Sequence, residues 1–138
     1  MLNCRFEELG HTAEIGLRIQ AGAPEELFAC AAQAMFSLLR APVNPEQPPH
    51  VHHVRIDAHD GESLLVDWLN ELLYLHETTG AIFNECTVLR WTLTHLEAEV
   101  YGRKPLAAPS LHIKAVTYHQ LAITADADGW TAQVYFDI

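Results

Sequence analysis

The sequence predicts an α+β fold: a single domain over residues 1–138, with a mostly antiparallel or mixed β-sheet of six to eight strands and two main helices packed on it. "AEIGLRIQ" (13–20) alternates apolar and polar residues, as does a strand with one buried face. Two longer segments instead repeat their apolar residues at helical spacing. The later part of the chain is rich in strand and turn patterns, and hairpin connections favour the α+β class.

The first predicted helix begins at Pro24, and its apolar stripe runs as far as Leu39. Proline suits a first helical turn, and the helix dipole favours Glu25 and Glu26 there. A proline-rich loop (41–53) and a short strand (54–58) follow. The second helix, 63–80, has the strongest pattern, and we expect Ser63 to cap it and Gly80 to end it.

The remaining residues predict strands. Residues 86–93 and 96–102 resemble a hairpin, and 112–125 reads as one or two strands. Asp128-Gly129 is the expected tip of a final hairpin. Its second strand is "WTAQVYFDI", in which Val134, Phe136 and Ile138 alternate with polar or amphipathic residues.

The composition excludes some functions. The formal net charge is -10, from 8 basic and 18 acidic residues. Direct nucleic-acid binding needs a basic face, so we do not expect it, whereas a cation or a basic protein remains a suitable partner. The bland alternative is that the charge simply keeps a small protein soluble.

Nothing predicts secretion or a membrane span. The N-terminus lacks the apolar core of a signal peptide, and no apolar run reaches the ~20 residues of a membrane helix. Cys4, Cys30 and Cys86 contain no C-x-x-C motif, so they indicate neither a zinc knuckle nor a redox pair. We therefore expect a reduced, cytoplasmic location.

Carboxylates at two strand ends are the first candidate site. Glu14 lies near the start of the first predicted strand, and Asp137 and the C-terminal carboxylate of Ile138 lie at the end of the last. If these strands are antiparallel neighbours, three carboxylates meet, and a hard divalent cation would relieve their repulsion. Calcium accepts irregular oxygen cages most readily, with magnesium or manganese as the alternatives. Otherwise these residues are ordinary solvated strand ends.

Three further groups of residues could carry chemistry or bind a partner. Asp67, Asn70, Glu71 and Tyr74 share one helix face, which is either solvated or a docking patch for a basic partner. In "KAVTYH", Lys114 and His119 could serve acid–base chemistry, although such residues more often pair across a sheet. In "HVHH", His50 and His52 would share a face if the run is extended and could then hold a transition metal. Otherwise these two and His53 are surface residues. No nucleophile–base set is visible.

Four motifs together resemble the archease family. They are "HTAEIGLRI", "LLVDWLNELLYLHE", "KAVTYH" and "VYFDI", and they occur in the family's order and spacing from Glu8 to Ile138. Each motif alone is weak, whereas all four in order are specific. The resemblance implies the archease fold and an accessory protein, not an enzyme.

The resemblance also implies a partner and a site. Archeases assist the GTP- and manganese-dependent RNA-splicing ligase by promoting guanylylation of its active-site histidine, which permits multiple turnover in tRNA splicing or RNA repair. The family's metal site maps onto Glu14, Asp137 and Ile138. Asp67, Glu71, Lys114 and His119 are the candidate partner-binding residues.

One position departs from the family motif, which usually has Asp where this chain has Glu14. The added methylene moves the carboxylate outward by about 1.5 Å, so the coordination cage must relax. Two alternative functions stay open at this point. A metal-dependent phosphoester hydrolase would need an open coordination position and a base. A general chaperone or adaptor of RNA-modifying enzymes would need an exposed apolar patch.

Overall fold

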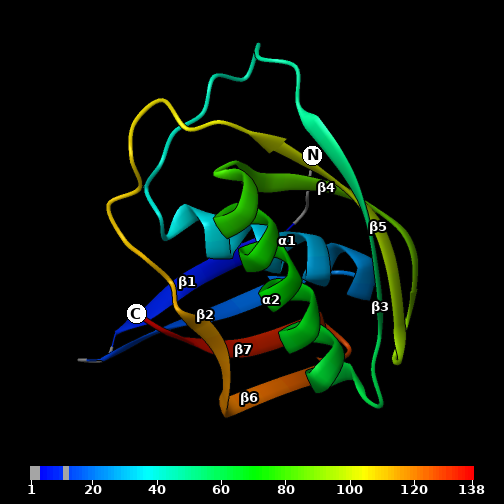
Figure 1. Cartoon of the computed structure of the whole chain (residues 1–138). Coiled ribbons are helices and arrows are strands. Elements are labelled where there is room, and N and C mark those ends of the chain that lie inside the picture. Colours follow the sequence, from blue (N-terminus) through cyan, green and yellow to red (C-terminus); the bar gives the residue numbers. More distant parts are fainter. Residues whose placement is uncertain (1–3, 11–12) are drawn as a thin grey trace.

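The computed structural model describes residues 4–10 and 13–138, which form two helices and seven strands in two antiparallel sheets (Figure 1). The four-stranded sheet has the order β1-β2-β7-β6, and the three-stranded sheet has the order β3-β5-β4. The elements are β1 (Cys4–Gly10), β2 (Glu14–Ala21), α1 (Pro24–Ser37), β3 (His50–Asp57), α2 (Gly61–Thr79), β4 (Ile82–Thr92), β5 (His95–Arg103), β6 (Ala115–Asp126) and β7 (Gly129–Asp137). The α+β prediction is confirmed, with the strands divided between two sheets.

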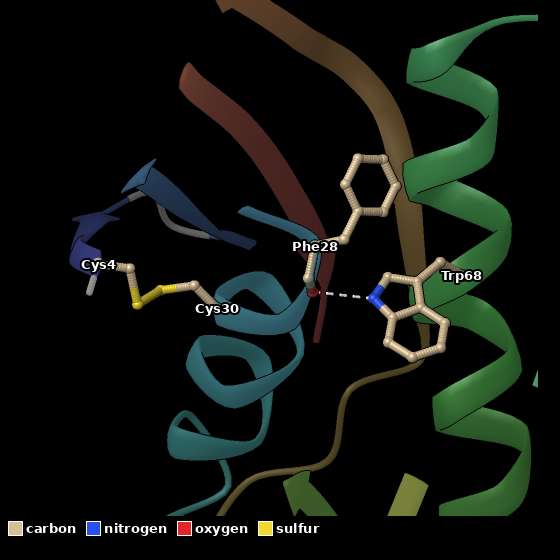
Figure 2. Close-up of a disulfide and its surroundings, with 4 residues drawn as sticks. All are labelled: Cys4, Phe28, Cys30 and Trp68. Carbon is tan, nitrogen blue, oxygen red and sulfur yellow. Dashed lines mark hydrogen bonds between the residues drawn. A yellow bond between two sulfur atoms is a disulfide. The ribbon is translucent and has the colours of Figure 1, made fainter. Parts of the chain in front are cut away.

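The helices pack against both sheets, and their apolar faces form one continuous core with the inner faces of the strands. Alternation explains why the strands join this core: Leu17 and Ile19 of β2 are fully buried, as is Val134 of β7. The largest fully buried side chains include Trp68 and Phe28, one from each helix. The indole Nε1 of Trp68 donates a 2.9 Å hydrogen bond to the main-chain oxygen of Phe28, which ties α2 to α1 (Figure 2).

The residues that flank helix α2 determine where it begins and ends. Asp60, not Ser63, is its N-cap, and the Asp60 carboxylate accepts a 2.7 Å hydrogen bond from the main-chain nitrogen of Ser63. The expectation of a Ser63 cap was therefore wrong, because the helix starts two residues earlier and an aspartate precedes it. Gly80 ends the helix in the left-handed region with φ 76°, as expected.

Several strands extend beyond their predicted bounds. β1 had not been predicted, because its residues are exposed on both faces and show no clear alternation. β3 begins at His50, inside the expected loop, because this strand pairs with β5 through Gly102 and Tyr101. Among the described residues, no helix is long and apolar enough to cross a membrane.

The cysteines differ from the sequence-based expectation. Cys4 of β1 and Cys30 of α1 form a disulfide, with their Cα atoms 6.3 Å apart, and Cys86 is free (Figure 2). The spacing did not indicate this pair because the two residues are 26 positions apart and β1 itself was not foreseen. Only the fold brings them together.

Candidate functional site

Glu14 and Asp137 are direct partners in the antiparallel pairing of β2 with β7. The start of β2 therefore abuts the end of β7, which confirms the strand arrangement on which the carboxylate prediction depended. Opposed residues on paired strands point to the same face, and their Cβ atoms lie ~5 Å apart. Both carboxylates thus belong to the outer face of the four-stranded sheet, opposite the face that buries Leu17 and Val134.

The last residue of β7 is held in place by a main-chain contact. The nitrogen of Lys114, just before β6, donates a 2.8 Å hydrogen bond to the main-chain oxygen of Asp137. Ile138 follows directly and is half-buried, while Asp137 is exposed. Lys114 was predicted as a partner-binding residue, and the structure places its main chain beside Asp137.

His119 reaches Glu14 from an irregular part of β6. Pairing with β7 is interrupted between Thr117 and Ala122, and Gln120 within this bulge has φ 51°. The imidazole Nδ1 of His119 lies 3.2 Å from a carboxylate oxygen of Glu14. Bulges often re-aim a side chain next to functional sites, and here the bulge brings together two residues 105 positions apart.

Tyr135 and Gly16 complete this corner, and sequence reasoning had singled out neither. The two residues are register partners, and a Cβ added to Gly16 would lie only 2.6 Å from the Tyr135 ring. The tyrosine ring therefore covers the glycine, and the His119 ring packs 5.6 Å from it. Glycine at position 16 lets this ring lie flat on the sheet beside Glu14.

The donor set suits a hard cation. Glu14 and Asp137 would supply side-chain carboxylate oxygens and Ile138 the main-chain oxygens of its C-terminal carboxylate, and calcium prefers oxygen ligands of this kind. Within residues 4–10 and 13–138, no three His, Cys, Asp or Glu side chains are grouped as a ready metal cage. A cation here would thus rely on main-chain oxygen and water beside the two carboxylates. The Glu14 carboxylate is partly accessible, with 24% of its side-chain surface exposed.

Asp67 and Glu71 do not lie at the corner formed by Glu14 and Asp137. They line a hollow of about 510 Å³ between α2 and β3, together with Tyr74 and Arg55. Asn70, on the same helix face, accepts a 3.1 Å hydrogen bond from the main-chain nitrogen of Val116 and so anchors β6 to α2. None of the residues that line this hollow belongs to the corner around Glu14 and Asp137.

The three histidines of "HVHH" do not all lie on one face of β3. The His52 ring packs against Phe83 with ring centres 5.5 Å apart, whereas His53 Nε2 lies 3.6 Å from a carboxylate oxygen of Glu97 on the other face of the sheet. His50 is exposed at the start of β3. Successive strand residues face opposite sides, so His53 is separated from His50 and His52, which share a face of β3 as an extended run predicts. Among the described residues, no group of three metal-binding side chains is found there.

His95 forms an ionic cluster that sequence reasoning missed. Its Nε2 lies 3.0 Å from Glu97, and its Nδ1 lies 2.7 Å from Asp57. The hydrogen bond to Glu97, then that to Asp57, raises the pKa of His95 above its usual value. Both ring nitrogens are engaged, so His95 fastens β5 to β3 and is not free for acid–base chemistry.

Comparison with known proteins identifies the family. The model of the Archease protein family (MTH1598/TM1083) matches residues 6–138. The chain belongs to the archease family. The archease of Methanosarcina barkeri is 40% identical over 142 residues, covering 97% of this chain and 96% of the relative. That of Pyrococcus abyssi is 36% identical over 141 residues, covering 97% and 99% respectively.

Solved structures share the archease fold. Protein 1598 of Methanobacterium thermoautotrophicum superposes with a TM-score of 0.76 at 29% identity and covers 96% of this chain and 98% of its own. An archease from Thermotoga maritima, described as a possible chaperone, gives a TM-score of 0.69 at 23% identity with 96% of each chain covered. The second likeness supports the fold alone. The family prediction made from four motifs is thus confirmed.

Proposed function

We propose that this protein is an accessory factor of a GTP- and manganese-dependent RNA-splicing ligase, promoting guanylylation of the ligase histidine and repeated turnover. Membership of the archease family supports this role. The direct pairing of Glu14 with Asp137 is the observation that supports these particular residues as the site of this role. The accessory protein needs no catalytic residue of its own, because the ligase supplies the phosphoryl-transfer chemistry.

Charge supports the proposed partner. An RNA ligase presents a basic groove to its substrate, and this protein carries a formal net charge of -10. Opposite charges accelerate encounter between proteins, and the acceleration weakens as salt rises. The acidic corner at Glu14 and Asp137 would dock at that groove. Asp67 and Glu71, in their separate hollow, would contact a different part of the ligase surface.

The acidic corner also gives the proposed action a chemical basis. Phosphoryl transfer depends largely on positioning and on neutralising charge. Glu14, Asp137 and the main-chain oxygen of Ile138 would hold a calcium-type cation, which supplies positive charge and fixes the geometry of the oxygens around it. His119 and Tyr135 would orient Glu14, because one contacts its carboxylate and the other packs against His119.

The alternatives have less support. The exposed large apolar side chains are distributed over separate elements, including Phe6 on β1, Val51 on β3, Tyr74 on α2 and Leu89 on β4. A general chaperone would present such residues as one continuous patch. A hydrolase would need an open coordination position on a bound metal and a nucleophile or water within reach of a base, and membership of the archease family supports neither.

The test is guanylylation of the cognate ligase, measured with radiolabelled GTP. Wild type, Asp137→Asn and Asp128→Asn are compared with ligase alone. Asp128 is an exposed acid in the turn between β6 and β7, at the other end of the sheet, so it is a matched charge control. We expect stimulation by wild type and Asp128→Asn and at least a tenfold smaller effect of Asp137→Asn. Equal stimulation by all three would remove Asp137 from the mechanism, and none by wild type would remove the proposed partner.

A further inference from the structure

The disulfide joins an edge strand to a buried helix, which is an unusual place for a covalent link. β1 is the outermost strand of the four-stranded sheet and, within residues 4–10 and 13–138, pairs only with β2. Most of its residues are exposed, including Phe6 at 40%. Cys30, in contrast, is fully buried in α1. The bond therefore ties the least buried strand of the fold to its core (Figure 2).

Other contacts of β1 are weaker than this bond. Its salt bridges, Glu7 with Arg18 and Glu8 with Arg40, lie between exposed groups, and such pairs contribute little stability. Arg5 donates a 3.2 Å hydrogen bond to the side chain of Gln20. The backbone pairing with β2 is complete from Cys4 to Gly10 but lies at a sheet edge. Without the bond, local opening of β1 becomes far easier.

The two sulfur atoms differ in accessibility. Cys4 is half-buried and lines a hollow of about 570 Å³, whose wall also includes Arg5, Asp126 and Asp128. Cys30, in contrast, has no exposed surface. Because Cys4 is the partly exposed residue of the pair, an incoming thiolate attacks its sulfur and not that of the buried Cys30.

We propose that Cys4 is a site of thiol–disulfide exchange with a dithiol reductant, and that the Cys4–Cys30 bond is a reversible clamp on β1. One thiolate of the dithiol attacks Cys4 Sγ and forms a mixed disulfide. The Cys4–Cys30 bond breaks, and Cys30 leaves as a thiolate that takes up a proton. The second thiol of the reductant then attacks the mixed disulfide. Cys4 is released as a thiol, and two electrons have passed from the dithiol, now a disulfide, to the protein.

Cys86 takes no part in this exchange. Burial raises the pKa of its thiol to about 12, so it remains protonated and unreactive at neutral pH. It lies in β4, in the other sheet. Cys86→Ser is thus a matched control that removes one thiol and leaves the clamp intact. The proposal does not depend on the role in RNA ligation.

The test is hydrogen–deuterium exchange of the oxidised protein before and after native treatment with dithiothreitol. We expect dithiothreitol to yield two new thiols without denaturant and to accelerate exchange of the β1 amides at least about tenfold. Amides of β7 should be unaffected, and Cys86→Ser should behave as wild type. Cys30→Ser, which cannot form the bond, should exchange in β1 like the reduced wild type.

Two results would overturn the clamp. One is unchanged exchange in β1 after complete reduction, which would mean that the bond does not restrain the strand. The other is resistance to dithiothreitol until denaturant unfolds the whole protein, which would mean that Cys4 is not reached in the folded state.

Discussion

Glu14 at the start of β2 lies directly opposite Asp137 at the end of β7, although 123 positions separate them in the sequence. Their side chains share the outer face of the four-stranded sheet, and His119 contacts Glu14 from the bulge in β6. Two negative groups at one sheet corner repel unless a cation or a basic partner offsets their charge. This relationship links the fold to the proposed role in RNA ligation.

Replacing Gly16 should disturb this corner. In Gly16→Ala, the added Cβ would lie 2.6 Å from the Tyr135 ring, so the ring must move away and its contact with His119 should weaken. We expect the free energy of unfolding to fall by about 1–3 kcal/mol, measured by urea denaturation. Gly10→Ala is the control, because none of the described residues lies within 4 Å of a Cβ at position 10. Equal stability of the two variants would show that the Tyr135 ring does not pack on Gly16.

Two tryptophans offer a matched pair of substitutions. Trp68→Phe removes the buried hydrogen bond from Nε1 to the Phe28 oxygen and leaves that oxygen without its indole donor, which should cost about 1–3 kcal/mol. The buried Trp91 Nε1 has no hydrogen-bond partner among the described residues, so Trp91→Phe should cost less. Chemical denaturation of both variants checks this order, and a costlier Trp91→Phe would contradict it.

The disulfide should contribute measurably to stability. It closes a loop between residues 26 positions apart, for which chain entropy predicts about 3–4 kcal/mol. Reduction should lower the free energy of unfolding of wild type and of Cys86→Ser by the same amount. Urea denaturation with and without a reductant measures the difference. An unchanged midpoint on reduction would contradict the entropic account.

Stability should fall as pH rises above the ordinary pKa of His95. Its pKa is raised by the hydrogen bonds to Glu97 and Asp57, so the folded state holds this proton more tightly than the unfolded chain. The resulting stabilisation is complete below the ordinary pKa of 6.5 and disappears as pH rises through the folded pKa. Denaturation curves at several pH values should show this loss in wild type and not in His95→Gln. The same slope in both proteins would assign it to another group.

The free energy of unfolding should also fall at acidic pH, because of Glu97. His95 lowers the pKa of Glu97, so the stabilisation from that carboxylate is present above its ordinary pKa of 4.5 and is lost as pH falls through the folded pKa. In Glu97→Gln, this part of the acid-induced loss of stability should be absent. An unchanged acid-induced loss in that variant would exclude the carboxylate as its source.

Strong periodic patterns allowed much of the fold to be predicted. The alternation in β2 and β7 and the apolar stripes of α1 and α2 gave the correct element types, because each buries one face. β1 could not be predicted, since Arg5, Glu7 and Glu8 show no periodic burial and the strand is defined by its pairing with β2. The division into two sheets likewise depends on long-range pairing.

The candidate site was only partly visible. Glu14 and Asp137 were placed together because antiparallel neighbours bring a strand start beside a strand end. His119 was noted as a candidate, but its contact with Glu14 depends on a bulge that has no sequence signature here. Gly16 and Tyr135 could have been found only from the register of β2 with β7. The pair of His95 with Asp57 arises in the same way from the register of β5 with β3, whereas Glu97 lies two residues further along β5 itself.

Calorimetric titration with calcium tests the central claim most directly. Wild type, Asp137→Asn and the distant control Asp128→Asn are titrated at low ionic strength after treatment with a chelator. The account predicts one saturable site in wild type and in Asp128→Asn, and at least a tenfold weaker affinity in Asp137→Asn. Equal calcium binding by all three proteins, or no saturable binding by wild type, would contradict the cation site at the meeting point of β2 and β7.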